Sequence, residues 1–74
     1  MSATKYDNGN TSALQVIDNG GTNKLTILQS PSFGKELMFT ITDSDTATSV
    51  VVNDIETLRK IGDFLNESIR WMEA

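Results

Sequence analysis

Residues 53–74 read NDIETLRKIGDFLNESIRWMEA, and this stretch decides the fold. The side chain of Asn53 can accept hydrogen bonds from the free amides of a first helical turn, and Glu56 three residues on completes a capping-box pattern. Asp54 and Glu56 also place negative charge at the positive end of a helix dipole. The sequence therefore predicts a helix that is capped by Asn53 and begins at Asp54.

This helix is strongly amphipathic. At about 100° per residue, one stripe repeats at alternating intervals of three and four residues. The stripe, which we expect to face the core, consists of Ile55, Leu58, Gly62, Leu65, Ile69 and Met72. Charged and amide side chains fill an opposite arc of roughly 140°, which is suited to solvent.

A second apolar surface lies beside that stripe. Ile61, Phe64 and Trp71 widen the apolar arc to roughly 200°, about twice what a one-sided surface helix needs. Together with Ser68, they form a face that we expect to contact a second copy of the chain, most simply in a two-fold helix-to-helix dimer with buried aromatic anchors. The alternative is that Phe64 and Trp71 pack on sheet edges or loops within one monomer.

Four segments upstream of the helix are predicted as strands: residues 12–18, 24–29, 36–42 and 48–52. The period-two alternation of a half-buried strand is present in residues 12–18 and clearest in residues 36–42. The predicted core-facing residues are Leu14, Val16, Leu25, Ile27, Leu37, Phe39 and Ile41. The predicted outer residues are Ala13, Gln15, Ile17, Thr26, Leu28, Met38, Thr40 and Ser49. We predict an α+β fold, in which an antiparallel four-stranded meander is followed by one C-terminal amphipathic helix packed on one face.

The segments between the strands contain turn-forming residues. Asn19-Gly20-Gly21 tolerates positive φ and predicts a tight hairpin, whereas Pro31 and Gly34 mark a loop over residues 30–35. Phe33 and Lys35 make this a possible binding loop, although Phe33 can also tuck beneath it. Residues 43–46, Asp-Ser-Asp-Thr, favour a turn over a metal site, which would need more oxygen ligands.

The first eleven residues are polar, and we predict that they form a flexible tail before a single domain of residues 12–74. One alternative is open: Thr4-Lys5-Tyr6 can pair with the next strand through the turn at residues 7–10 and form an edge strand.

Composition narrows the function classes. The 74 residues include no cysteine and no histidine, which removes the usual thiol nucleophile, general base and soft metal ligands. A net charge of −4 argues against nucleic-acid and anionic-membrane surfaces, and no apolar run reaches the length of a membrane span. We expect a cytoplasmic protein without enzymatic activity, cofactor or metal.

The element order resembles that of the single-stranded-DNA-binding coactivator and Whirly type of module, which dimerises through its helices. The resemblance implies nucleic-acid binding. Such modules need basic strands with aromatic side chains for stacking, whereas the predicted strands contain only Lys24 besides the loop residue Lys35.

The expected function is that of a small binding protein that forms a homo-oligomer through the C-terminal helix. The size, acidity and Ser/Thr/Asn content are typical of phage and mobile-element accessory proteins that bind and inhibit a host factor or sequester a small ligand. The alternatives are a single-stranded nucleic-acid-binding module and a purely structural oligomerisation domain.

Overall fold

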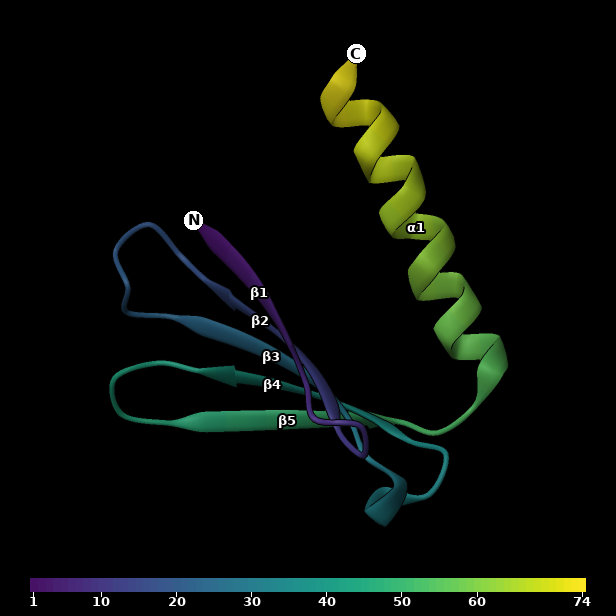
Figure 1. Cartoon of the computed structure of the whole chain (residues 1–74). Coiled ribbons are helices and arrows are strands. Elements are labelled where there is room, and N and C mark those ends of the chain that lie inside the picture. Colours follow the sequence, from purple (N-terminus) through teal and green to yellow (C-terminus); the bar gives the residue numbers. More distant parts are fainter.

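The computed structural model describes the backbone of residues 1–74 and every side chain except that of Phe33. The chain forms one five-stranded antiparallel sheet, followed by a long helix (Figure 1). The strands follow one another in the sheet in sequence order, as a meander. The elements are β1 (Ser2–Asp7), β2 (Ser12–Ile17), β3 (Lys24–Gln29), the short 3-10 helix η1 (Pro31–Phe33), β4 (Leu37–Thr42), β5 (Ala47–Val52) and α1 (Ile55–Glu73).

The α+β class and the antiparallel meander are confirmed, but the predicted number of strands was wrong by one. Residues 2–7 were predicted as part of the tail, but they form β1 and pair with β2 from Ser2↔Ile17 to Asp7↔Ser12. The alternative in which Thr4-Lys5-Tyr6 forms an edge strand is confirmed. The turn explains this pairing, because Asn8 Oδ1 accepts from the amides of Asn10 (3.1 Å) and Thr11 (2.8 Å). Every residue of β1 is exposed, so hydrophobic alternation could not reveal it.

The register sorts the strand residues onto two faces, because residues directly opposite in an antiparallel pair point the same way. One face, called here the inner face, contains all seven predicted core-facing residues and gains two from β5: Leu14, Val16, Leu25, Ile27, Leu37, Phe39, Ile41, Val50 and Val52. The opposite face, called here the outer face, contains all eight predicted outer residues. The predicted division of the strands into two faces is confirmed.

The helix cap lies one residue later than predicted. Asp54, not Asn53, is the N-cap: Thr57 N donates to Asp54 Oδ1 at 2.7 Å, and Thr57 Oγ1 donates to Asp54 Oδ2 at 2.9 Å. Both residue types make good caps. The side chain of Thr57 supplies a second donor to Asp54, and α1 therefore begins at Ile55.

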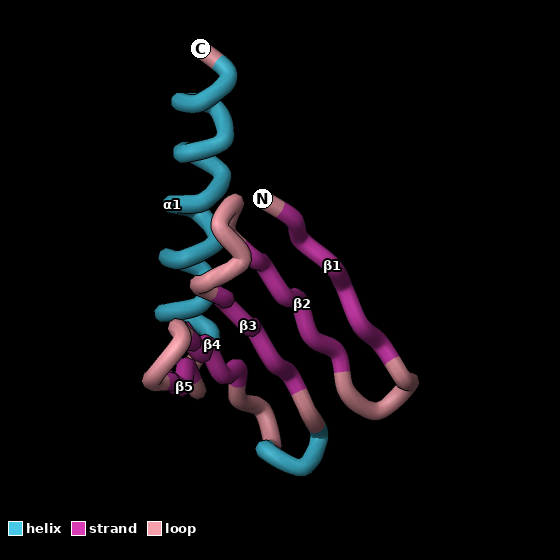
Figure 2. The backbone as a smooth tube through the Cα atoms, turned by 90° about the vertical axis from the view of Figure 1, so that its left-hand side faces the viewer, coloured by secondary structure: helices cyan, strands magenta, loops and turns pink.

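The predicted packing of the helix on the sheet was wrong for a single chain. In Figures 1 and 2, α1 leaves the end of β5 and points away from the strands at an open angle. No residue of α1 is buried. The physical reason is the connection: only Asn53 and Asp54 separate β5 from α1, and Asp54 has extended backbone (φ −131°, ψ 144°). With extended backbone at Asp54, α1 continues outward from the end of β5.

The result is an open molecule. Its radius of gyration is 13.6 Å, whereas a compact domain of this length has about 11 Å. Over the part of the chain that the structure describes, no helix is both long enough and apolar enough to cross a membrane.

Candidate protein interface

The candidate site is defined by apolar side chains that the rest of the chain leaves exposed. Among the side chains that the structure describes, none is buried. Ile41 and Val50 on the inner face are each 62% exposed, and on α1 Phe64 is 66% and Trp71 78% exposed. Since large contiguous apolar patches are rare on soluble monomers, this surface is the candidate interaction surface.

The four predicted interface residues lie on α1. Phe64 and Trp71 are exposed, whereas Ile61 and Ser68 are half-buried. The hydroxyl of Ser68 donates to the backbone carbonyl of Phe64 at 2.9 Å, so its hydrogen-bonding capacity is partly used inside the helix. Phe64 and Trp71 are therefore the exposed members of the predicted interface.

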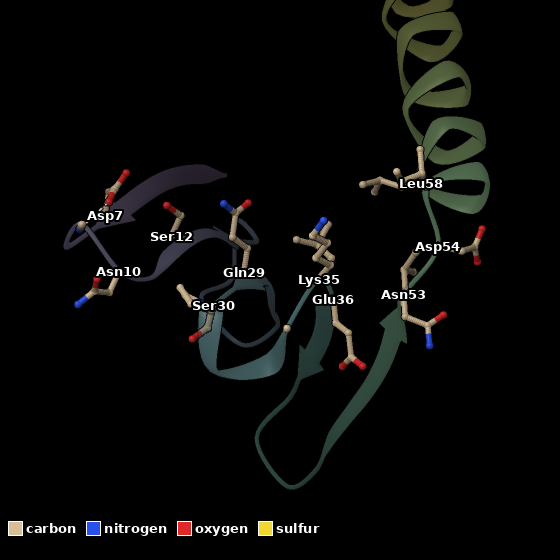
Figure 3. A pocket seen from close by; sticks show the side chains of 16 residues that line it. Asp7, Asn10, Ser12, Gln29, Ser30, Lys35, Glu36, Asn53, Asp54 and Leu58 are labelled. Atoms are coloured by element: carbon tan, nitrogen blue, oxygen red, sulfur yellow. Dashed lines mark hydrogen bonds between the residues drawn. The ribbon is translucent and has the colours of Figure 1, made fainter.

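The inner face and α1 meet in a groove of about 820 Å3 (Figure 3). Leu37 and Val52 at the end of the sheet line it together with Ile55 and Leu58 at the start of α1. The polar lining residues come from the β1–β2 connection, the β3–β4 loop and the ends of the strands, and include Asp7, Asn10, Ser12, Gln29, Lys35 and Glu36. The groove is the corner of the open angle, with apolar side chains contributed by both walls.

The β3–β4 loop borders this corner and contains the predicted binding loop. Ser30 Oγ accepts from the amide of Ser32 at 3.3 Å, and Gly34 has a φ of 74°, which favours glycine. Lys35 is exposed and lines the groove. The side chain of Phe33 lies outside the described part of the structure. Lys35 and the pair Phe64 and Trp71 are not brought together, since the groove is lined only by the first turn of α1.

The aspartate carboxylates in the turns between strands accept hydrogen bonds from residues of the same turn. Asp43 Oδ1 accepts from the amides of Asp45 and Thr46, both at 2.8 Å, and these bonds hold the pKa of Asp43 below its usual value. The side-chain amide of Asn23 donates to Asp18 Oδ2 at 2.9 Å and lowers the pKa of Asp18 in the same way. The turn interpretation of residues 43–46 is confirmed. No metal-holding group of three or more acidic side chains occurs among the described residues.

The outer face has a different character. One polar, uncharged row crosses all five strands: Thr4, Gln15, Thr26, Thr40 and Ser49. Within it, the hydroxyls of Thr40 and Ser49 lie 2.8 Å apart in a hydrogen bond. The next row toward the helix end of the sheet is more apolar and consists of Tyr6, Ala13, Leu28, Met38 and Val51.

Sequence reasoning missed the corner itself. Val50 and Val52 were seen as strand residues without a face, and Ile55 and Leu58 were expected to lie against the chain's own sheet. The alternation of Thr48, Val50 and Val52 in β5 was the available signal for the first pair. The angle of α1 has no comparable signal in the sequence, because amphipathicity does not say which chain covers an apolar stripe.

Comparisons of the chain with protein-family models, curated proteins and solved structures find no match.

Proposed function

We propose that this protein is a non-enzymatic binding protein that works as a homo-oligomer, with α1 at the contact between subunits. The single observation behind the proposal is the exposure of apolar side chains on α1 and on the inner face, with none of the described side chains buried. A chain of this size needs most of its apolar residues in a core to fold. Another protein chain can supply the missing cover.

The magnitudes support assembly. Seven large apolar side chains of α1 are exposed: Ile55, Leu58, Phe64, Leu65, Ile69, Trp71 and Met72. Covering each contributes roughly 1.5–3 kcal/mol when burial is complete, so the helix alone offers on the order of 10 kcal/mol. That gain is comparable to the cost of association, estimated at about 4–15 kcal/mol, and the inner face adds to it.

The surface chemistry favours a protein partner over nucleic acid. β1 adds Lys5 and Tyr6 to the sheet, but Lys5 falls on the inner face and Tyr6 on the outer face. The outer-face positions of the strands thus combine one aromatic side chain, Tyr6, with one lysine, Lys24. Stacking of single-stranded nucleic acid needs several aromatics in a positively charged groove, and the net charge is −4.

The test is a comparison of Trp71→Ala with Lys60→Ala by sedimentation equilibrium. We expect Trp71→Ala to raise the dissociation constant of the assembly about thirtyfold or more, which corresponds to a hot-spot loss of about 2 kcal/mol. Lys60 lies on the polar arc of α1, so Lys60→Ala should leave assembly unchanged. Equal dissociation constants for both variants and the unmodified chain would refute the proposal.

A further inference from the structure

We infer that a second copy of this chain occupies the open angle between the inner face and α1. In the resulting dimer, α1 of each copy lies between the inner face of the other copy and α1 of the other copy. This inference rests on the proposed function and adds the identity of the contacting surfaces. The groove shows how the angle is built, because Leu37 and Val52 of the sheet and Ile55 and Leu58 of the helix line one continuous corner. A helix placed in that corner touches both walls.

The excess surface fits a dimer. The chain exposes 5943 Å², whereas a folded monomer of this mass exposes about 4,500 Å². The excess of about 1,400 Å² per chain, counted over two copies, falls in the range of about 2,000–5,000 Å² that obligate homodimers bury. A second copy therefore covers the amount of surface that the open molecule leaves in water.

The inner face is wide enough to receive the partner's helix. Five strands at a spacing of about 4.8 Å form a face about 20 Å wide, and one helix with its side chains is about 10–12 Å across. The 19 residues of α1 rise about 28 Å, which is long enough to cross the whole inner face.

The apolar arc of α1 agrees with this placement. An arc of roughly 200° is twice what one contact surface requires, and a helix in the corner contacts two surfaces, the partner's sheet and the partner's helix. The polar arc, with Arg59, Asp63 and Glu67 among its residues, remains in solvent. No charge of α1 then has to be buried without a partner, which would otherwise cost several kcal/mol.

A two-fold axis makes the arrangement self-complementary. Each chain offers one open angle and one helix of the right length, so the same contact occurs twice and the assembly closes as a dimer. In the single chain α1 points away from its own sheet, which leaves each inner face accessible to the other copy.

The direct test is an isotope-filtered NOE experiment on an equal mixture of carbon-13-labelled and unlabelled chain. We expect intermolecular NOEs between inner-face methyl groups, such as those of Leu14, Ile27 and Ile41, and the aromatic protons of Phe64 and Trp71. A dimer with intermolecular NOEs only between helices would overturn the inferred contact between α1 and the partner's inner face, but it would leave the proposed function standing. Helix-to-sheet NOEs confined to one chain would also overturn the inferred contact with the partner's inner face. A monomer would refute both.

A matched pair of variants tests the same surface by affinity. Ile41 on the inner face is 62% exposed and Val51 on the outer face 46% exposed, so a lysine at either position can reach water in the single chain. We expect Ile41→Lys to weaken the dimer by about tenfold or more, and Val51→Lys by less than about twofold, in sedimentation equilibrium. Equal weakening by the two lysines would contradict the assignment of the inner face.

Discussion

Aspartate side chains organise the turns of this protein at the scale of single residues. Asp7, Asp18, Asp43 and Asp54 each accept hydrogen bonds from the segment that follows them. The donor that lowers the pKa most differs among them. It is a backbone amide at Asp7, Asp43 and Asp54, and the side chain of Asn23 at Asp18. The ionised carboxylate is thus the form that the folded chain uses.

The first prediction concerns pH. Because these four pKa values lie below the ordinary 3.8 in the folded chain, the unfolded chain binds more protons between the two sets of values. Their contribution to stability is complete above about pH 5 and is lost as pH falls through and below 3.8. Thermal unfolding followed by circular dichroism should show this decline.

The control is a variant in which all four aspartates are replaced by asparagine, which keeps an oxygen acceptor but does not titrate. Its unfolding temperature should fall less between pH 5 and pH 2.5 than that of the unmodified chain. An identical decline in both proteins would mean that other groups cause the acid sensitivity.

The second prediction concerns the helix cap. Asp54→Ala removes the acceptor of two bonds from Thr57, so it should lower both the helix content and the unfolding temperature. Asn53→Ala should change neither, because Asn53 is not the cap. Circular dichroism of the two variants decides between the positions. A larger effect of Asn53→Ala would restore the cap that the sequence pattern suggested.

At the scale of elements, the hydrophobic pattern of the sequence predicts strands β2 to β5 and the two faces of the sheet. β2 to β5 were predicted to within a residue at either end, because apolar side chains recur at every second position on their inner face. β1 was not, since its residues are exposed on both faces and backbone pairing with β2 holds it. The two faces follow from the alternation, whereas amphipathicity alone does not determine the position of α1.

The third prediction concerns the β2–β3 hairpin. Of the residues that we expected to tolerate positive φ, Gly21 has a φ of 72°, and the structure describes no atom within 4 Å of the Cβ that alanine would add. Gly21→Ala should therefore lower the free energy of unfolding through backbone strain alone, by about 1 kcal/mol.

Gly20→Ala is the matched control. Its added Cβ would meet Thr22 Oγ1 at 3.6 Å and Asp18 Oδ1 at 3.7 Å, which are ordinary contacts, and Gly20 lacks a positive φ. Chemical denaturation should show little change for this variant. A loss at Gly20 as large as that at Gly21 would argue against the hairpin geometry.

At the scale of the whole molecule, the candidate site was predicted in part. The sequence singled out Phe64 and Trp71, and both are exposed on α1. It did not indicate the corner between Leu37, Val52, Ile55 and Leu58, because residues of two elements form it only once the angle of α1 is set. Assembly through α1 and the inner face stays a prediction, and it makes the folding stability depend on protein concentration.

The most direct test of this assembly is the mass of the unmodified chain in solution, measured by light scattering behind a sizing column over a dilution series. We expect a particle of twice 8.1 kDa that persists on dilution and whose unfolding temperature rises with concentration. A folded particle of 8.1 kDa at every concentration would refute assembly, because one chain would then have covered its own apolar surface.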